Sequence, residues 1–562
     1  MKMRKKSGIL LLVVVLLVSL LAACSNKADN DGKNTESGEQ SGSGANGANA
    51  PSGEVEAGDP FGRYEEPVEV TFAGYIDDTM QKNLLVDGLS YEDNQWTKII
   101  EEKLNIKVKY KWISKTGEQS AQKMNLALAS GDIPDILVLD PVQLSQAARA
   151  DILADIGPYM EQYMSPEVKG LVSQIGESAK QAATFDGKVL GFPSTNDLAP
   201  ETGFLWLRTD WLKKLNLELP KSWADVKAIS KAFATQDPDG NGKNDTFGLS
   251  LSNDYNTIEG VMNGFHANTK IWVEKDGKLE FGGIQPEARA ALAELADMYK
   301  AGEIDKEFGL KGGDKIAEGV ANQQIGMTYG PFYLSLHPLG EALKSNPDAD
   351  WTPVLIPSID EKPVTSTFTL GYGSFITVRK GFEHPEALIK LLNLYYKMYT
   401  EDYNQYGVSE NGKENWRLSP VEIRDVSKNV NTYLAIKDAV ASGDTSKLIG
   451  EQRAMFDNVD KFLKGDASMW GWNKVFGENS TEAGIKQLMD NKQYVQDKFV
   501  GSPTKTMITT MSTLNKLREE TFYKIIMGNS PADEFEAFVQ SWKKLGGEQI
   551  TKEVNEWYDG VK

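Results

Sequence analysis

The sequence predicts an α/β protein with more than one domain, and three observations support this. Short apolar runs alternate with amphipathic stretches along most of the chain, a pattern typical of βα units that favours a mainly parallel sheet. The run Ile136–Leu139 lies between two Pro/Asp pairs and predicts a fully buried central strand. About 500 residues follow a polar N-terminal region, which is too many for a single core.

The first expected elements follow from residue periodicity. We expect a strand at Val68–Phe72, a helix around Trp96–Leu104 and a strand at Ile106–Trp112. A helix through Met124–Ala129 then leads into the strand at Ile136–Leu139. Each strand is short and rich in β-branched or aromatic residues, and each helix repeats its apolar residues every three or four positions.

The later expected helices have recognisable start signals. Ser222, with Asp225 three residues on, forms a capping-box pattern. Pro286, Pro385 and Pro531 stand where a first-turn proline is favoured, because the missing N–H has no partner in a first turn. The apolar stripes of these helices, and of a final helix, are Val226–Phe233, Leu388–Tyr399, Phe535–Trp542 and Ile550–Trp557.

The N-terminus has the pattern of a secretion signal. Basic residues between Lys2 and Lys6 precede the apolar run Ile9–Leu21, which is too short for a stable membrane span. The run ends in Leu21-Ala22-Ala23-Cys24, which resembles a bacterial lipobox. We therefore expect residues 1–23 to be removed and Cys24 to carry a diacylglyceryl and palmitate anchor that holds the protein at the membrane.

Cys24 is the only cysteine of the chain, so no disulfide forms within it. The alternative is a secreted protein whose cysteine lies near the cleavage site by chance. Residues 24–62 are expected to be a flexible tether, because Ser25 to Gly58 contain no aromatic residue and many Gly, Ser and Asn. Such a spacer suits the outer face of a Gram-positive membrane.

Composition narrows the classes of partner. The formal net charge is −19, and the expected signal removes only basic residues, so the mature chain is more acidic still. Such a surface repels phosphate backbones, and nucleic acid is therefore excluded as an expected partner, whereas neutral solutes are not. The chain also has 12 Trp, 20 Tyr and 21 Phe, a few of which are expected to stack on sugar rings while most form the core.

An exported enzyme acting on polysaccharides is the main alternative class. The three histidines, His266, His337 and His384, are scattered, and neither H-E-x-x-H nor G-x-S-x-G occurs. No spacing among the many carboxylates distinguishes a catalytic pair. The sequence therefore predicts no catalytic residues.

Several segments, in the same order, resemble the family of extracellular solute-binding proteins that includes the maltose-binding and alginate-oligosaccharide-binding proteins. The resemblance extends over residues 66 to 400, and the C-terminal third is less specific. The segments that carry it are Leu126–Ile136 with its Gly-Asp turn, Phe185–Pro193, Leu205–Leu212 followed by Pro220–Trp223, Ile325–Phe332, and Ser374–Leu394.

The resemblance implies a type II periplasmic-binding-protein-like fold, with two α/β lobes joined by a hinge and the ligand cleft between them. The N-terminal lobe would comprise residues 63–198 and 353–430, and the C-terminal lobe 199–352 and 431–562. It also implies a monomer that binds an oligosaccharide without changing it and delivers it to ABC importer permease subunits. A sensory or peptide-binding lipoprotein of the same fold remains an alternative.

The candidate ligand-binding residues fall into three groups. The resemblance places Phe332 at a position where relatives stack an aromatic ring on sugar, with Tyr333 beside it and Tyr255 at another cleft position. Near the expected crossovers, side chains could hydrogen-bond vicinal hydroxyls or stack on a sugar ring. Trp470 and Trp472 could contact the sugar in the same way, or they could pack within the protein. Arg208 either forms a salt bridge within its lobe or meets an acidic sugar. The crossover residues are Asn196, Asp197, Glu201 and Tyr372.

One loop has the spacing of a calcium site. Oxygen-bearing residues alternate from Asp237 onward, with Gly242 at the sixth position as in an EF-hand loop. Gly248 occupies the twelfth position, where a glutamate is usual, so the sixth ligand is open. Similar loops occur in the alginate-binding relatives, and the alternative is an Asp/Asn/Gly-rich turn. The expected ligands of a structural Ca²⁺ are Asp237, Asp239, Asn241, Lys243 and Asp245.

Overall fold

The computed structural model describes residues 58–562 except 77, 86–87, 202, 253–255 and 410–412. The expected signal segment, Cys24, most of the tether and Tyr255 lie outside the described residues. The description below concerns the unit that ends at Lys562.

The first lobe contains two groups of strands. β1 (Val68–Tyr75) pairs in parallel with β2 (Ile106–Ser114), starting at Val68 opposite Ile106. β14 (Tyr372–Val378) pairs antiparallel with both β3 (Ile136–Leu139) and β6 (Phe192–Thr195). The expected mainly parallel sheet is therefore wrong for this lobe. β14 enters after a long excursion of the chain, so no helical crossover fixes its direction as parallel.

Asp135 joins the two groups of strands. Its Oδ2 accepts hydrogen bonds from the backbone N–H of Thr71 in β1 at 3.0 Å and from the Thr71 hydroxyl. Its Oδ1 accepts from Nη2 of Arg379, which follows β14, at 2.7 Å. Arg379 and Thr71 hold the pKa of Asp135 below its usual value against the effect of burial. The carboxylate thus links the middle of β1 to the start of β3 and the end of β14.

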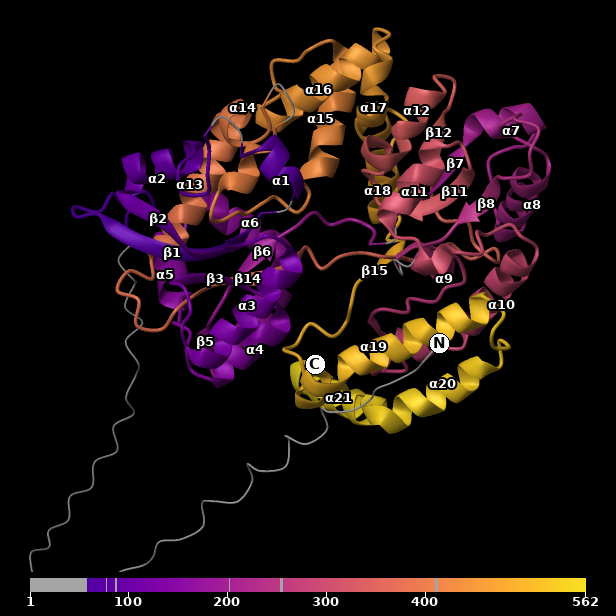
Figure 1. Ribbon diagram of the computed structural model, residues 1–562. Coiled ribbons are helices and arrows are strands. Elements are labelled where there is room, and N and C mark those ends of the chain that lie inside the picture. Colours follow the sequence, from indigo (N-terminus) through magenta and orange to yellow (C-terminus); the bar gives the residue numbers. More distant parts are fainter. Residues whose placement is uncertain (1–57, 77, 86–87, 202, 253–255, 410–412) are drawn as a thin grey trace, which may run out of the picture. The chain divides into compact units, whose positions relative to one another are not determined.

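Helices cover both faces of these strands. In the view of Figure 1, α2 and α13 lie above β1 and β2, and α3 and α4 lie below β3 and β14. α4, which was not predicted from the sequence, begins where Asp140 accepts a hydrogen bond from the N–H of Gln143 and Pro141 occupies the first turn. The bounds are α2 Gln95–Leu104, α3 Gly117–Ser130, α4 Pro141–Arg149, α6 Pro166–Ala182 and α13 Ala387–Glu401.

The second lobe is built on a four-stranded sheet in the order β12-β7-β11-β8. β11 is parallel to β8 only, since β7 and β12 run antiparallel to their neighbours. Pro353 and Val354 pair with β7, although the expected bounds assign them to the first lobe. The other lobe bounds stay a prediction. The strands are β7 Phe204–Arg208, β8 Phe247–Ser250, β11 Ile325–Gly330 and β12 Trp351–Val354.

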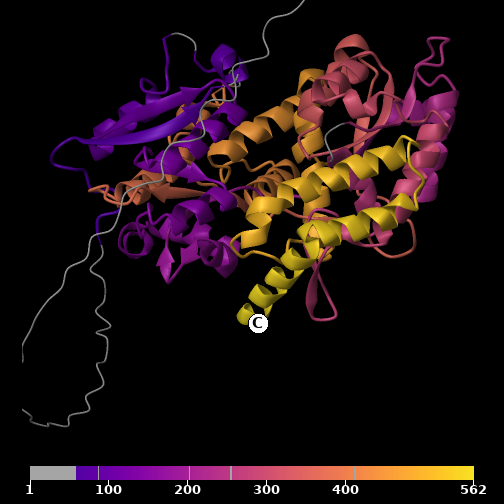
Figure 2. The same cartoon turned by 60° about the horizontal axis from the view of Figure 1, so that its bottom comes forward.

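The second-lobe helices pack on this sheet and on one another. α8 (Trp223–Thr235) starts at the predicted capping box of Ser222 and Asp225, and buries Val226, Ile229 and Phe233. The C-terminal helices share the same core, and Figure 2 shows them in yellow. The bounds of the C-terminal helices are α19 Lys505–Ile526, α20 Glu534–Trp542 and α21 Glu548–Val561, and α10 (Glu287–Lys300) contributes to the same core.

After α13 and the short α14 (Tyr403–Tyr406), the chain forms helices α15 to α18 before it reaches α19. They pack around two small hydrophobic cores, one of which also includes buried side chains of β7 and β12. Figure 1 shows them in orange. Their bounds are α15 Lys428–Ser442, α16 Gly450–Leu463, α17 Trp470–Phe476 and α18 Thr481–Asp490.

Four chain segments pass side by side where the lobes meet, and we call them the junction: residues 195–201, 366–371, 424–429 and 493–497. Backbone N–H groups of Asn196, Leu198 and Glu201 donate to carbonyls of Gly371, Val426 and Thr367, each at 2.8 Å. In the same way, β13 (Ser366–Thr367) pairs in parallel with β15 (Tyr494–Val495). Extended segments of this kind link the lobes through backbone hydrogen bonds, and buried side chains such as Phe368 and Val426 pack beside them.

Candidate functional site

A pocket of about 430 Å³ lies within the first lobe, in the size range of sites for small ligands. It opens where β1 ends, where α3 begins and beside the exposed Val138 of β3. The far wall is the segment from Trp416 to Glu422. Its aromatic and polar lining residues are Tyr75, Tyr91, Tyr110, Ser120, Gln143, Ser194, Ser374, Trp416, Arg417, Ser419 and Glu422.

Val138 shows how the strand pattern makes this pocket. The sequence predicts a fully buried β3, but the Val138 side chain is 49% exposed while its three neighbours in the strand are buried. Side chains alternate between the faces of a strand, and on its face Val138 lies at the pocket and stays uncovered. Val138 of the apolar strand β3 thus forms part of the pocket wall.

Trp416 is the central side chain of the far wall. It belongs to the short 3-10 helix Asn415–Leu418, and the indole N–H of Trp96 anchors this helix by donating to the carbonyl of Asn415 at 3.0 Å. The guanidinium carbons of Arg417 and Arg424 lie 4.6 Å and 4.1 Å from the Trp416 ring centroid. Cation–π contacts of this length fix the orientation of the ring.

Each of these arginines already has a carboxylate partner. Nε of Arg417 donates to Glu414 at 2.6 Å, and Nη2 of Arg424 donates to Glu422 at 3.0 Å. The pocket therefore offers balanced charge, with carboxylate oxygens that accept hydrogen bonds and guanidinium groups that donate them. Such a set matches hydroxyl groups, which both donate and accept.

Tyrosines form the opposite side of the pocket. The rings of Tyr91 and Tyr110 lie 5.0 Å apart, and the Tyr91 hydroxyl donates to the carbonyl of Tyr75 at 2.7 Å. Tyr75 itself is 42% exposed. The pocket can therefore enclose a ring-shaped, hydroxyl-rich molecule between aromatic surfaces.

None of the predicted ligand-binding residues that the structure describes lines this pocket. Asn196, Asp197 and Glu201 lie in the junction, and burial raises the pKa of both carboxyl groups. Tyr372 begins β14 and is 8% exposed, with its ring 5.8 Å from that of Phe375 in the first-lobe core. Their ligand roles stay predictions.

Phe332 and Tyr333 directly follow β11 in the second lobe. Their rings meet edge to face at 5.2 Å, and the carbonyl of Phe332 accepts a hydrogen bond from the Thr481 hydroxyl at 3.2 Å. The Tyr333 side chain is 50% exposed, so its ring is accessible for stacking.

The two C-terminal tryptophans have packing contacts. Trp470 is buried in the core around β7, and its indole N–H donates to Oδ1 of Asp350 at 3.0 Å. Trp472 is partly buried and stacks on Phe476 with ring centroids 6.4 Å apart. These contacts favour the packing alternative for Trp470.

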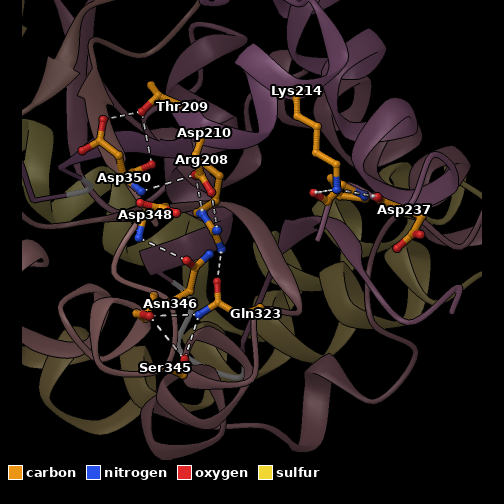
Figure 3. A network of polar contacts seen from close by, with 12 residues as sticks. Arg208, Thr209, Asp210, Lys214, Asp237, Gln323, Ser345, Asn346, Asp348 and Asp350 are labelled. Atoms are coloured by element: carbon orange, nitrogen blue, oxygen red, sulfur yellow. Dashed lines mark hydrogen bonds and ion pairs between the residues drawn. The ribbon is translucent and has the colours of Figure 1, made fainter. Parts of the chain in front are cut away.

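Arg208 forms a salt bridge within its lobe, as one of its two expected roles requires. Its side chain is fully buried and donates to both carboxylate oxygens of Asp210, at 2.8 Å and 2.6 Å, and to the Gln323 amide at 2.7 Å (Figure 3). Trp211 stacks on the guanidinium at 4.5 Å. With every side of the guanidinium occupied, Arg208 serves the structure of the second lobe.

In the expected calcium loop, the carboxylate oxygens of Asp237, Asp239 and Asp245 lie close together around Asn241. The backbone N–H groups of Gly240 and Asn241 donate to Asp237 at 3.1 Å each, and the Asn241 amide donates to Asp239 at 2.6 Å and to Asp245 at 3.1 Å. Burial and the neighbouring Asp237 raise the pKa of Asp239. The crowding of carboxylates and the oxygen-only donor set fit a hard cation.

No group of three or more His, Cys, Asp or Glu residues in the described part of the chain has the arrangement of a metal site. Lys214 also donates to the carbonyl of Pro238 at 2.8 Å, which places an ammonium group beside the loop (Figure 3).

His266 is the one described histidine that contacts both a serine and an aspartate. Its Nε2 lies 2.9 Å from Oδ1 of Asp360 and 3.4 Å from the hydroxyl of Ser358. A catalytic triad needs the carboxylate and the hydroxyl on different ring nitrogens. Because both groups contact the same nitrogen, this arrangement does not form a proton relay.

The pocket residues were not predicted from the sequence. Trp416-Arg417 is an aromatic-cation pair within a polar stretch, the same signal that drew attention to Trp470, and it could have been found in that way. Tyr75, Tyr91 and Tyr110 come from separate elements, and only the fold brings them together.

Comparisons with known proteins agree with the architecture. A family model for bacterial extracellular solute-binding proteins matches residues 88–398. Lipoprotein LipO of Bacillus subtilis is 24% identical over 486 residues, covering 83% of this chain and 89% of LipO. At this level of identity, the two proteins share a fold over most of their length.

Solved structures give the same result. The alginate-binding protein AlgQ2, in a crystal structure without calcium ion, has a TM-score of 0.62 at 17% identity and covers 88% of this chain and 99% of AlgQ2. The EF-hand mutant of FusA from S. pneumoniae, in complex with fructo-nystose, has a TM-score of 0.58 at 17% identity, with the same coverage. The expected two-lobed α/β fold is thus confirmed. Within the described ranges, no helix has the length and apolarity that a membrane crossing requires.

Proposed function

Because the chain belongs to the family of bacterial extracellular solute-binding proteins, we propose that it binds an oligosaccharide and delivers it to the permease of an ABC-type importer. The observation that carries the proposal is the first-lobe pocket, with Trp416 on one wall and tyrosines on the other. Relatives of the same fold bind alginate and fructo-nystose. Both ligands are carbohydrates, and aromatic walls with paired charges suit sugar rings.

The second lobe completes the site when the ligand is bound. Tyr333 supplies an exposed ring on that lobe, at the position where the resemblance expects stacking. A ligand that contacts both lobes binds the closed arrangement better than the open one and so shifts the population towards it. The extended segments of the junction are suited to such a change, because hinges are formed by a few residues that change their backbone angles.

The protein acts as a monomer at the outer face of the membrane, held by lipid on Cys24 after residues 1–23 are removed. The lipobox pattern supports this proposal, and so does the likeness to a lipoprotein over most of the chain. Labelling with a palmitate analogue tests it, with Cys24→Ala as the unlabelled control.

Ca²⁺ bound by the loop from Asp237 to Asp245 supports the second lobe without taking part in ligand chemistry. The Asn241 side-chain amide donates to Asp239 and Asp245, and its backbone N–H donates to Asp237, which supports this proposal because a cation would replace these hydrogen atoms as the partner of the carboxylates. The carbonyl of Lys243 would add a ligand. The EF-hand named for FusA is consistent with such a loop.

Isothermal titration calorimetry tests the ligand class. Kestose, maltotetraose, trigalacturonate and alginate trisaccharide are titrated into the protein, alongside tripeptides of matched size. The proposal expects one saccharide to bind at one site per chain and to be recovered intact by chromatography. Binding of peptides alone supports the peptide-binding alternative, and recovery of shortened saccharide supports an enzyme.

A further inference from the structure

A carboxyl group without hydrogen-bond partners lies beside the junction. Glu482 is the second residue of α18 and is 1% exposed, and neither of its carboxyl oxygens has a partner within the described residues. Asp197, in the junction, also lacks a hydrogen-bond partner at Oδ1, but its Oδ2 accepts a hydrogen bond from the Asn429 amide at 3.1 Å. A buried carboxylate without donors is costly, so such a group tends to keep its proton.

The charges around Glu482 favour its neutral form. Burial is the main cause that raises the pKa of Glu482 to about 8, the negative charge of Asp197 raises it further, and Lys428 opposes them. The Lys428 ammonium is already engaged, because it pairs with Oε1 of Glu451 at 2.7 Å. At neutral pH, Glu482 is therefore protonated.

The other charged groups near this pair also have partners of their own. Arg424 in the junction is bound to Glu422, and Lys474 of α17 pairs with Asp350 at 3.0 Å. Asp425 and Glu451 add negative charge near Asp197 and raise its pKa. Each of these cations thus already has a carboxylate partner, and Lys428 offsets an ionised Glu482 only in part.

The same cluster is in contact with the pocket. Arg424 lowers the pKa of Asp197 and also lies over the ring of Trp416. Its backbone N–H donates to the hydroxyl of Thr195, at the end of β6, at 2.7 Å. A change of charge at Asp197 and Glu482 therefore acts on a side chain that supports the pocket wall.

We propose that the proton on Glu482 allows α18 to pack beside Asp197 and that its loss loosens the junction, which makes the hinge pH-sensitive. Two like charges would then lie side by side in a poorly solvated place and repel each other. The effect on ligand affinity rests on the proposed function. The effect on the junction does not.

The direction follows from proton binding in the folded and unfolded chains. Glutamate in an unfolded chain loses its proton near pH 4.3, whereas Glu482 in the folded chain keeps it to about pH 8. Between these values the folded state binds more protons than the unfolded state. The free energy of unfolding therefore falls as pH rises through this window, and the contribution is lost above the folded pKa.

The test compares Glu482→Gln with the wild type at about pH 6 and about pH 9, by melting temperature and by limited proteolysis of the ligand-free protein. We expect cleavage within the junction to rise about fivefold at high pH in the wild type and to stay constant in the variant. Glu303→Gln is the matched control. Glu303 is also buried with an unpartnered oxygen but lies beside β8 of the second lobe, so this variant should keep the wild-type response.

A rise of equal size in Glu482→Gln would overturn the proposal, and so would its loss in the Glu303 control. If Glu482→Gln fails to fold, the variant Asp197→Asn tests the proposal independently. Removing the neighbouring charge lowers the pKa of Glu482, so the response should move to lower pH, and an unmoved midpoint contradicts the proposal.

The second part of the test measures ligand affinity, with a saccharide that binds in the calorimetric titrations described above. We expect the wild type to bind it about fivefold more weakly at pH 9 than at pH 6, and Glu482→Gln to bind it equally at both. An equal loss in both proteins contradicts the coupling. If no saccharide binds at any pH, the proposed function is wrong, and the ligand-free response still decides the inference.

Discussion

The Arg424 guanidinium lies 4.1 Å from the ring centroid of Trp416, and the same arginine forms an ion pair with Glu422 at 3.0 Å. The ring is thus held by a cation that is itself held by a carboxylate. A recognition surface that is rigid before the ligand arrives loses less entropy on binding. We regard this pair as the fixed part of the first-lobe site.

Replacing Trp416 by alanine should weaken saccharide binding about 10- to 100-fold, because a buried aromatic anchor contributes much of the binding energy of a site. The melting temperature should fall little, because the ring lies at the edge of the core. Calorimetry with the saccharide bound by the wild type gives the ratio. Trp557→Ala, which removes a partly buried tryptophan outside the pocket lining, is the matched control, and an equal loss in both variants would place the site elsewhere.

Replacing Arg208 by methionine should lower the free energy of unfolding by about 3 kcal/mol, because the partly buried Asp210 would lose its cation and Gln323 would lose its donor. Urea unfolding gives this value. Arg289→Ala, which removes an exposed ion pair with Asp533, should cost less than about 1 kcal/mol. Saccharide affinity should be unchanged in folded Arg208→Met, and its loss would give Arg208 a ligand role.

A chelator should lower the melting temperature if the Asp237 loop holds Ca²⁺, because an ion bound only by the folded state stabilises it. The double variant Asp239→Asn with Asp245→Asn should have the lower melting temperature already and should not respond to the chelator. Asp276→Asn, in the turn between β9 (Trp272–Lys275) and β10 (Lys278–Phe281), should respond as the wild type does. No chelator effect on the wild type, with no calcium by elemental analysis, would exclude the ion.

Asp497 should make stability fall between about pH 4 and about pH 7. Burial raises its pKa to about 7, while the backbone N–H groups of Trp272 and Phe499 partly oppose this by donating to it. The unfolded chain therefore loses this proton first, and the free energy of unfolding decreases as pH rises. Asp497→Asn keeps an acceptor oxygen but cannot ionise, so its profile should be flatter.

The surface variant Asp132→Asn is the control for this pH profile, because its carboxylate is 78% exposed. Melting temperatures across the window test the prediction. A wild-type slope in Asp497→Asn would assign the dependence to another group.

Elements with strong local signals could be predicted from the sequence. The capping box at Ser222 and the strand at Val68 depend on neighbours in the chain, and each lies where the sequence indicates. Strand direction depends on where the chain returns from, which is why the antiparallel β14 was missed. Val138 was expected to be buried for a similar reason, since no local signal shows that its side chain lies at a pocket.

The candidate site was largely beyond sequence reasoning. Family resemblance directed attention to Phe332 and to the crossover near Asp197, because those segments are collinear with relatives. Trp416 lies past residue 400, where the resemblance ends, and its wall of tyrosines is assembled from three separate elements. Arg208 shows the opposite case, because Asp210 two residues on was a visible partner and the salt-bridge role was correctly expected.

Mass spectrometry of the small molecule released by denaturing the purified protein tests the central claim most directly. The account predicts an intact oligosaccharide, at up to one per chain, that is depleted in Trp416→Ala prepared in the same way. Release of peptides, or of the same saccharide in equal amount from Trp416→Ala, would contradict it.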